Sequence, residues 1–346
     1  MKINPYIQDI LSQPQAIRST LQHFNAQILQ EISQMVQASG FQRIILTGMG
    51  ASYYGSYPAW VSLMQQGLPA FWVDTGELCN YFPELITPES LLWIVSQSGK
   101  SAEILALLEM VRQRPARAIL ATTNDMESEL ALQSDLALDL HIGEESTVST
   151  RSYVSTLAAN ALAVAQMTGK DAEKVGDELQ QTAQGVENYL KDWQEQVQRW
   201  EKVLGVPERL YILGRGPSLA AVKTGALILK ESAKFQVEGL NSAQFRHGPL
   251  ELADPRLAAI FLAGKQPTRA MNRKLAEEMR SHRAQVVWIG EQTTSNASEI
   301  PMPVTPEAGE EIAEMIPIQM LSLALAEQTG VEPGIFRYIG KITQEQ

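Results

Sequence analysis

A serine-rich segment has the residue types and spacing to bind an anion. Ser96-Gln97-Ser98-Gly99-Lys100-Ser101 follows the apolar run at residues 91–95 and precedes a helical pattern. Hydroxyls and unpaired backbone N–H groups at a helix N-terminus donate toward phosphate oxygens, so this segment can form a phosphate cradle. A simple helix cap needs one serine rather than three, which favours the binding interpretation.

Two other segments also lie between an expected strand and an expected helix. Residues 145–152, which include Ser149, are rich in hydroxyls and lie between an expected strand and an expected helix. The sequence Thr47-Gly48-Met49-Gly50-Ala51-Ser52 also lies between a strand and a helix. In a parallel sheet such loops gather at the carboxyl ends of the strands, where ligands bind. We therefore expect these loops to converge on one site.

The glycine loop occurs twice. Residues 47–52 match residues 213–218, Leu213-Gly214-Arg215-Gly216-Pro217-Ser218, which predicts an internal duplication. A dinucleotide site prefers a third glycine, where this chain has Tyr53 and Leu219. Asp74, at the end of the next expected strand, leaves nicotinamide binding open as an alternative. A tight strand-to-helix turn is the simpler interpretation of either loop.

Glu231 and His247 are the candidates for acid–base chemistry. Glu231 lies in an expected helix over residues 218–237, on an apolar stripe that would raise its pKa if it were buried. A carboxyl with a raised pKa is suited to proton transfer. His247 precedes Gly248-Pro249 and can exchange protons near neutral pH. Taken alone, Glu231 is more often a paired structural carboxylate, and His247 is more often a packing residue of a loop.

The elements that must position these residues follow an α/β pattern. Short apolar runs without polar alternation are typical of strands covered on both faces, and helical segments lie between several of them. They predict doubly wound parallel sheets in two halves. The expected strands are residues 43–47, 70–74, 91–96, 117–122, 136–142, 209–213, 257–263 and 285–289, and the first forty residues are expected to be helical up to Gly40.

Composition limits the class of protein. The chain has 346 residues, a formal net charge of −11 and one cysteine. This length suits two domains, and the acidic charge disfavours nucleic acid as a partner. No apolar run is long enough for a membrane span and no signal peptide is evident, so we expect a cytoplasmic protein. Cys79 is expected to be structural, and with His23, His141 and His282 lacking ligand spacing, neither a metal site nor a cofactor is expected.

These motifs together resemble a known family. Ser96-Gln97-Ser98-Gly99, Ser149-Thr150-Arg151 and Lys230-Glu231 followed by His247-Gly248-Pro249 resemble the double SIS (sugar isomerase) family. That family includes the isomerase half of glucosamine-6-phosphate synthase, amino-sugar phosphate deaminases and fructosyl-amino-acid phosphate deglycases. The resemblance implies two tandem SIS domains, each a three-layer, flavodoxin- or Rossmann-like parallel sheet, in a homodimer. The expected divisions are residues 1–24 (helical segment), 25–170 (first SIS domain), 171–202 (helical crossover), 203–330 (second SIS domain) and 331–346 (tail).

The resemblance also implies roles for single residues. Glu231 matches the group that moves a proton between C1 and C2, and His247 matches the group that assists ring opening, in its own or the partner subunit. Lys341 matches a lysine that contacts the open-chain sugar, with a solvated tail lysine as the alternative. The positions that match sugar-phosphate contacts are Ser52, Ser96, Gln97, Ser98, Ser101 and Ser149.

The expected activity is an aldose–ketose isomerase and deaminase that converts glucosamine-6-phosphate to fructose-6-phosphate and ammonia. Lys100 stands where the synthase has Glu, and Arg151 where it has Lys, which leaves the substrate open. The synthase's glutaminase domain has no counterpart in the sequence, so glutamine-dependent synthesis is not expected. The alternatives are a fructosyl-amino-acid 6-phosphate deglycase and a sugar-phosphate-binding regulator without catalysis.

Overall fold

The computed structural model describes residues 2–290 and 298–343, which form two compact units. The N unit comprises residues 12–183 together with the tail from Tyr338 onward. The C unit comprises the chain up to Leu11 together with residues 184–337. Each unit therefore contains a short segment from the opposite end of the chain.

The N unit is built on a five-stranded parallel sheet in the order β2-β1-β3-β4-β5. Central strand β3 is buried along its whole length, which explains its uninterrupted apolar sequence. The strands are β1 (Arg43–Gly48), β2 (Ala70–Trp72), β3 (Ser90–Val95), β4 (Ala118–Thr123) and β5 (Leu136–Asp139).

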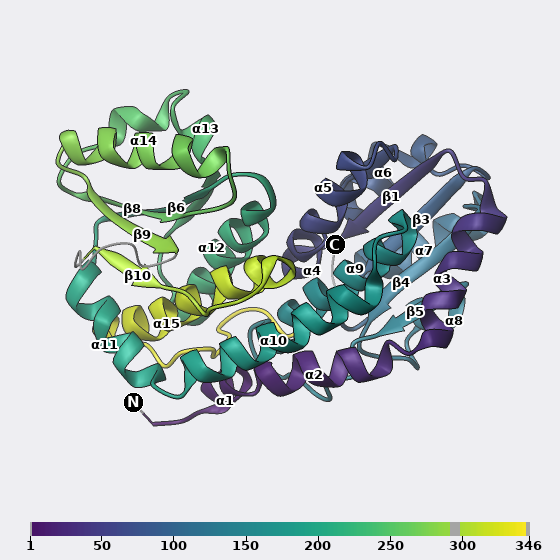
Figure 1. Cartoon of the computed structure of the whole chain (residues 1–346), viewed down its shortest axis with the longest axis horizontal. Helices are drawn as coiled ribbons and strands as arrows, with labels where there is room; N and C mark the ends of the chain where they lie inside the picture. Colours follow the sequence, from purple (N-terminus) through teal and green to yellow (C-terminus); the bar gives the residue numbers. More distant parts are fainter. Residues whose placement is uncertain (1, 291–297, 344–346) are drawn as a thin grey trace. The chain divides into compact units, whose positions relative to one another are not determined.

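Helices cover both faces of this sheet, as Figure 1 shows. On one face the apolar side chains of α6, α7 and α8 join those of β1 and β3 in a single cluster. On the other face α9 packs on α2, α3, α4 and α5. The helices are α2 (Gln13–His23), α3 (Ala26–Ser39), α4 (Gly50–Gly55), α5 (Tyr57–Gln65), α6 (Thr75–Asn80), η1 (Pro83–Leu85), α7 (Ala102–Gln113), α8 (Glu129–Gln133) and α9 (Arg151–Thr168).

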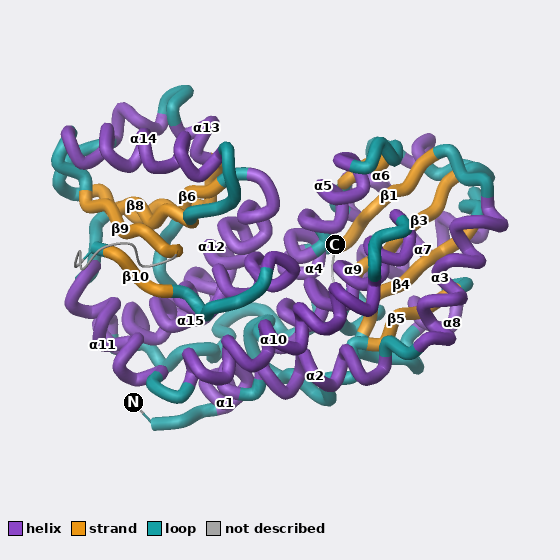
Figure 2. Tube along the Cα trace, in the orientation of Figure 1, coloured by secondary structure: helices purple, strands orange, loops and turns teal. Residues whose placement is uncertain are grey.

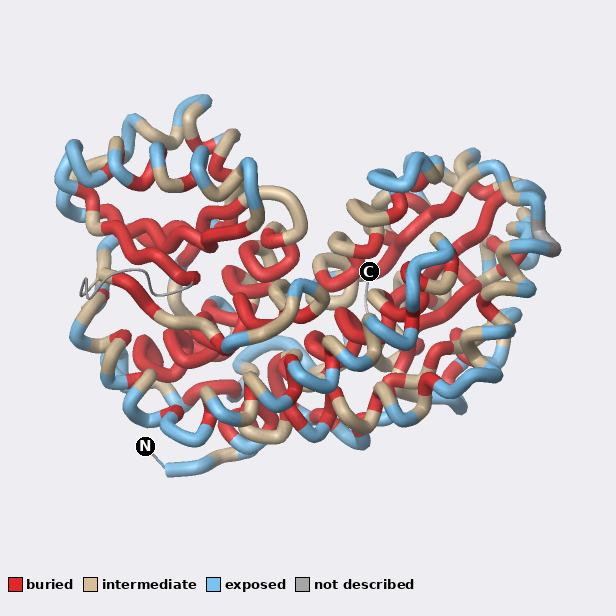
Figure 3. The backbone as a smooth tube through the Cα atoms, viewed as in Figure 1, coloured by how far each residue is buried: buried red, intermediate tan, exposed pale blue. Residues whose placement is uncertain are grey.

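The C unit repeats the same topology with the order β10-β9-β8-β6-β7. Strand β8 is buried along its whole length in this unit (Figure 3), and each neighbouring pair of strands is parallel. The strands are β6 (Arg209–Gly214), β7 (Glu238–Asn241), β8 (Leu257–Leu262), β9 (Gln285–Gly290) and β10 (Glu299–Pro301). Strands β7 and β10 are short, and neither was expected from the sequence.

Helices again flank the sheet (Figure 2). Apolar residues of α13 and α14 pack against β6, β8 and β9 on one face, while α12, α15 and α11 pack together on the other. The helices are α1 (Pro5–Leu11), α11 (Trp193–Leu204), η2 (Gly216–Ser218), α12 (Leu219–Ala233), α13 (Ser242–Phe245), η3 (Pro249–Leu252), α14 (Thr268–Ser281), η4 (Glu307–Gly309) and α15 (Glu310–Thr329), and α10 (Ala172–Leu190) belongs partly to each unit.

Two expected helices have different limits in the structure. The N-terminal run is three helices rather than one, because Asn25 caps α3 by accepting a hydrogen bond from the Ile28 N–H at 3.1 Å. Helix α12 ends at Ala233 rather than near residue 237, because Lys234 adopts a left-handed conformation with φ of 54°. The expected end of α3 at Gly40, with φ of 52°, is confirmed.

Two expected strands are shorter than the sequence indicated. Strand β2 ends at Trp72, and Asp74 instead caps α6 by accepting from the Glu77 N–H at 2.9 Å. Strand β5 ends at Asp139 rather than at residue 142. Asp74 therefore lies at the N-cap of α6, with Oδ1 bound to the helix backbone, rather than at the end of a strand.

The strand order identifies the place in each sheet where a ligand can bind. Successive connections run in opposite directions from β1 and from β6, so the switch points lie between β1 and β3 and between β6 and β8. We call these the N switch point and the C switch point. In the described residues no helix is long and apolar enough to cross a bilayer.

Candidate functional site

The loop after β3 forms one side of the N switch point. Its backbone turns at Gly99, where φ is 61° and a Cβ atom would lie 2.3 Å from Ser128 Oγ, so only glycine fits. The Gly99 N–H donates to Ser96 Oγ at 3.2 Å, and the Lys100 N–H donates to Ser98 Oγ at 3.3 Å. Each hydroxyl acts as an acceptor in these bonds, so its own proton can donate to a ligand oxygen.

This loop leads directly into the twelve-residue helix α7. Ser101 occupies the N-cap position but makes no side-chain capping bond. Ser96 is buried, while Gln97, Ser98 and Ser101 are half-buried. The Gln97 carbonyl accepts from the Asn124 N–H at 3.0 Å, which ties the loop to the end of β4. The arrangement places serine hydroxyls and a helix N-terminus beside one another, as an anion site requires.

The loop after β1 forms the other side of the N switch point. Gly50 has a φ of 53°. A Cβ atom on Gly48 would lie 2.6 Å from the Val95 carbonyl oxygen, so β1 and β3 approach closely here. Ser52 follows in α4 and is half-buried. The next residue, Tyr53, stacks on Trp72 with ring centroids 3.9 Å apart. An aromatic stack therefore supports the turn that carries Ser52.

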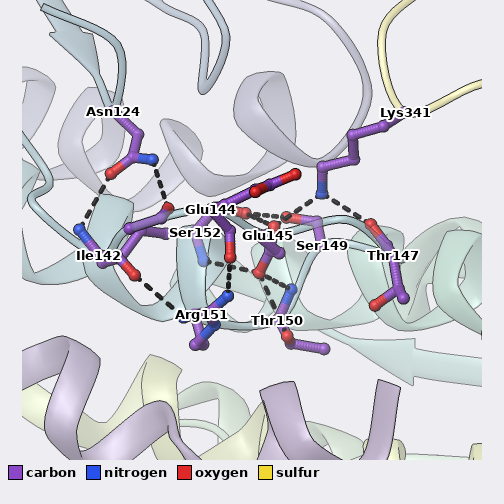
Figure 4. A network of polar contacts seen from close by, with 11 residues as sticks. Asn124, Ile142, Glu144, Glu145, Thr147, Ser149, Thr150, Arg151, Ser152 and Lys341 are labelled. Carbon is purple, nitrogen blue, oxygen red and sulfur yellow. Dashed lines mark hydrogen bonds and ion pairs between the residues drawn. The ribbon is translucent and has the colours of Figure 1, made fainter. Parts of the chain in front are cut away.

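The segment that contains Ser149 is organised by a buried carboxylate (Figure 4). Glu145 Oε1 accepts from the N–H groups of Thr150 and Ser152 at 3.0 and 3.1 Å and from Thr150 Oγ1 at 3.2 Å. Glu145 Oε2 accepts from Ser152 Oγ at 2.6 Å. Ser149 Oγ in turn lies 2.6 Å from Ser152 Oγ. The negative charge stands at the N-terminus of α9, where the helix dipole stabilises it.

The C-terminal tail lies against these same segments. Lys341 Nζ donates to Glu145 Oε2 and to the Thr147 carbonyl, both at 2.7 Å (Figure 4). Two residues further on, the Thr343 carbonyl accepts from the Ala102 N–H at 3.1 Å, at the first turn of α7. The tail is thus fastened to both the Ser149 segment and the start of the helix that follows the serine loop.

The structure brings most of the expected site residues into one unit. The six serine and glutamine positions expected to bind phosphate, Ser52, Ser96, Gln97, Ser98, Ser101 and Ser149, all belong to the N unit, as does Lys341. The first five of these six residues follow β1 or β3 in the chain, so they lie on the two sides of the N switch point. Ser149 and Lys341 are joined to each other through Glu145 and Ser152.

Glu231 and His247 belong to the C unit. Glu231 is half-buried near the end of α12. The backbone carbonyls of Glu231 and Ile335 both accept hydrogen bonds from Lys234 Nζ. His247 follows α13 and is exposed, and its backbone N–H donates to the backbone carbonyl of Gln244 at 2.9 Å. Gly248 holds the next turn with a φ of 135°. His247 is therefore presented on a tight turn with its ring accessible to solvent.

The C switch point carries a different set of side chains. Ser218, the counterpart of Ser52, donates to Glu314 Oε1 at 2.8 Å. Glu314 lies in α15 and is only 4% exposed, and its pKa is raised to about 8 by burial and by the nearby Glu311. Lys265, after β8, lies within 3.5–3.7 Å of the carboxylates of Glu307, Glu310 and Glu311.

Sequence reasoning missed Glu145 and Glu314. Glu145 stood at the start of the hydroxyl-rich segment and received no role, because it lies six residues before Arg151, where α9 begins, and is too far from the helix start to be read as a cap. Glu314 lies among the apolar residues of α15, and a lone acid in such a pattern indicates a buried partner. In both cases the partner is far away in the sequence.

Cysteine and metal chemistry find little support in the described part of the chain. Cys79 is half-buried against the apolar cluster of α6 and α7, and burial together with Glu103 raises the pKa of its thiol to about 11. At neutral pH it is a protonated thiol and a poor nucleophile. Residues 2–290 and 298–343 contain no group of three or more His, Cys, Asp or Glu side chains placed to hold a metal ion.

Comparison with known proteins gives relatives along nearly the whole chain. Glutamine–fructose-6-phosphate aminotransferase [isomerizing] of Thermococcus kodakarensis is 27% identical over 350 residues, which cover 97% of this chain and 57% of that protein. The human aminotransferase 2 is 25% identical over 316 residues, which cover 87% and 46%. The chain thus spans only about half the length of these curated relatives.

Solved structures share the fold. The C-terminal domain of glucosamine-fructose-6-phosphate aminotransferase from Francisella tularensis superposes with a TM-score of 0.85 at 22% identity, covering 99% of both chains. Glucosamine-6-phosphate deaminase from Thermotoga maritima superposes with a TM-score of 0.79 at 19% identity, covering 99% of this chain and 100% of that one.

The family profile described as "SIS domain" matches the chain twice, at residues 39–166 and 204–326. The first match falls within the N unit and contains all five of its strands, and the second falls within the C unit and contains all five of the others. The duplication expected from the two glycine loops is thus a pair of SIS domains, and the chain belongs to the SIS domain family.

Proposed function

We propose that this protein is a phosphosugar aldose–ketose isomerase that deaminates glucosamine-6-phosphate to fructose-6-phosphate and ammonia. The observation that carries the proposal is the serine loop at the N switch point. Its hydroxyls accept from backbone N–H groups and keep their own protons for a ligand, at the start of α7. A hydroxyl-lined helix N-terminus suits a phosphate monoester in a chain with a net charge of −11, since the anion must be held locally.

The remaining candidate residues provide the chemistry. His247 assists opening of the pyranose ring, and Glu231 takes the C2 proton and returns it to C1. The product carries an imine at C2, which water hydrolyses to the ketone of fructose-6-phosphate with release of ammonia. Holding the phosphate keeps C1 and C2 in register during these steps. A cytoplasmic homodimer is part of the same proposal.

The relatives support the choice of substrate class. Two of the similar proteins are named for glutamine–fructose-6-phosphate amination, and one solved structure with the same fold is a glucosamine-6-phosphate deaminase. Tagatose-6-phosphate ketose/aldose isomerase from Escherichia coli has the same fold as well, with a TM-score of 0.80. A sugar 6-phosphate is common to these names, and isomerisation is named in the aminotransferases and in the tagatose-6-phosphate enzyme.

The first test measures ammonia and fructose-6-phosphate in the same reaction with glucosamine-6-phosphate. We expect equal amounts of both from the wild-type protein. Glu231→Gln should lower kcat by about 10²- to 10⁴-fold, because it removes the proton-transfer group, while glucosamine-6-phosphate still raises the Tm. Glu277→Gln, an exposed carboxylate on α14 in the same unit, is the matched control and should behave as the wild type.

Other results would redirect the assignment. Wild-type turnover in Glu231→Gln would remove this residue from the mechanism. If glucosamine-6-phosphate raises the Tm but yields neither product, the isomerase assignment fails. The phosphosugar site then remains, and a deglycase substrate or a regulatory role must be tested instead.

A further inference from the structure

Glu145 is a buried carboxylate whose partners come from two distant parts of the chain. It accepts from Thr150 N and Oγ1, from Ser152 N and Oγ, and from Lys341 Nζ, which lies 196 residues away in the sequence. Its side chain has no solvent-exposed surface. A helix cap needs only the contacts of one oxygen to the N–H groups, so the second oxygen serves another purpose.

The two carboxylate oxygens divide this work. Oε1 receives the backbone N–H groups of Thr150 and Ser152 and thereby fixes the turn that carries Ser149. Oε2 receives the Ser152 hydroxyl and the Lys341 ammonium. One side chain therefore connects a predicted phosphate-binding position to the predicted sugar-contacting lysine (Figure 4).

The charge of Glu145 is maintained inside the protein. Burial alone raises the pKa of this carboxyl, but the Lys341 ammonium and the hydrogen bonds from Lys341 and Ser152 outweigh burial and hold the pKa below its usual value. Glu145 and Lys341 thus form a buried ion pair at neutral pH, and removing one partner leaves the other charge uncompensated.

The ammonium of Lys341 keeps a donor for a ligand. An ammonium group has three N–H donors, and Glu145 and the Thr147 carbonyl account for two of them. The Thr343 carbonyl, bound to the Ala102 N–H, fixes the tail just beyond Lys341. The lysine is thus oriented from two sides with one N–H left over.

From these contacts we infer that Glu145 is a positioning residue of the proposed reaction, which orients Lys341 toward the open-chain sugar and Ser149 toward its phosphate. The inference rests on the proposed function. It assigns Glu145 no contact with the substrate, because both of its oxygens are occupied by protein donors.

The test is a double-mutant cycle on kcat and KM with glucosamine-6-phosphate. Lys341→Met should lower kcat by about 100-fold, within the range for removing one N–H donor to the oxygen of the reacting sugar. Glu145→Gln should lower kcat by at least tenfold, because its neutral amide no longer holds the ammonium. If Glu145 acts through Lys341, the double variant should have the kcat of Lys341→Met within about twofold. Glu144→Gln, the exposed neighbouring carboxylate, is the matched control and should keep wild-type kinetics.

A purely structural role gives a different pattern. In that case Glu145→Gln lowers kcat by the same factor with or without Lys341, and this additivity in kcat overturns the inference. The KM reports the turn that carries Ser149, so it should rise in Glu145→Gln and in the double variant alike, and an unchanged KM contradicts that part of the role. Unchanged kcat in Glu145→Gln overturns it as well. If Glu145→Gln does not fold, Glu145→Asp keeps the charge but sets the carboxylate one methylene back from Lys341 Nζ. A kcat loss of about tenfold is then expected, and wild-type kcat contradicts the role.

The failure of this inference can be told apart from failure of the proposed function. Absence of turnover in the wild-type protein contradicts the proposed function, and the positioning role falls with it. Wild-type turnover combined with additive variants contradicts only the role of Glu145.

Discussion

The two switch points have the same backbone and different chemistry. Gly50 and Gly216 begin the loops after β1 and β6 with φ of 53° and 58°, and Gly99 and Gly264 turn the loops after β3 and β8 with φ of 61° and 65°. At the N switch point these turns present serines that only backbone groups engage. At the C switch point the corresponding serine, Ser218, is bound by the buried Glu314 of α15.

This difference separates the fold from the function. Both sheets offer the place where α/β proteins bind ligands. At the N switch point Ser96 and Ser98 accept from backbone N–H groups, which leaves their own protons to donate, whereas at the C switch point Ser218 donates its proton to Glu314. At the C switch point carboxylates of α15 surround Lys265, and a phosphate would meet like charges there. We therefore expect phosphosugar binding at the N switch point and a structural role for the C switch point.

Replacing the matched glycines should give the largest contrast. Gly99→Ala should weaken glucosamine-6-phosphate binding at least 100-fold, because the new Cβ would lie 2.7 Å from Ser128 Cβ as well as 2.3 Å from its Oγ. Gly264→Ala meets Ser218 Oγ at 3.3 Å and should change Kd less than twofold. Both variants should lose roughly 1–2 kcal/mol of stability from the left-handed backbone. Calorimetric titration measures Kd, and equal weakening in both variants would refute the assignment of the ligand to one switch point.

The two buried carboxylates should give opposite pH dependences of stability. The pKa of Glu314 is raised to about 8, so its contribution is complete below its unfolded pKa near 4.5 and is lost as the pH rises through 8. The pKa of Glu145 is lowered, so its contribution is present above the unfolded pKa and is lost as the pH falls through the folded value. Between pH 6 and pH 9 the wild type should lose roughly 2–3 kcal/mol relative to Glu314→Gln.

Urea unfolding of both proteins at several pH values measures this difference. Glu144→Gln serves as the charge-matched control and should follow the wild type. Parallel curves for the wild type and Glu314→Gln would show that Glu314 is ionised in the folded protein at pH 6.

The smallest expected effect concerns the lysines beside the two switch points. Lys100 forms an exposed ion pair with Asp125, and Lys100→Ala should change the free energy of unfolding by less than about 1 kcal/mol. Lys265 lies among three carboxylates, so Lys265→Ala should lower the free energy of unfolding by more than Lys100→Ala does at low salt. The difference between the two variants should become smaller at high salt, because salt screens the charges. Thermal unfolding at two salt concentrations measures both variants. A larger decrease in Tm for Lys100→Ala than for Lys265→Ala at low salt would contradict this prediction.

The sequence was sufficient for eight of the ten strands in the two sheets, because their signals are local, but not for the short strands β7 and β10, which contain no apolar run. Strand β3 is buried on both faces and so reads as an apolar run, and the paired glycines mark turns that need a positive φ. Helix ends were predicted less well, since the end of α12 depends on the left-handed conformation of Lys234, a residue type that rarely marks a stop.

The polar networks could not be predicted in the same way. The serine loop and Lys341 were expected, but Glu145 meets Lys341 across 196 residues and Ser218 meets Glu314 across 96. No pattern within a few residues carries such pairings, because only the folded chain brings the partners together. A buried acid in an apolar context indicates that a partner exists without indicating which one.

The aromatic stack beside Ser52 gives the N switch point an optical reporter. The indole of Trp72 stacks on Tyr53 and its Nε1 donates to the Tyr53 carbonyl at 3.1 Å, one residue after Ser52. Indole emission depends on stacking and on hydrogen bonding, so a shift of this turn on ligand binding changes the fluorescence of Trp72. The chain has six tryptophans, so the difference in emission change between the wild type and Trp72→Phe isolates the contribution of Trp72, and occupancy of the site can be followed in solution without any added label.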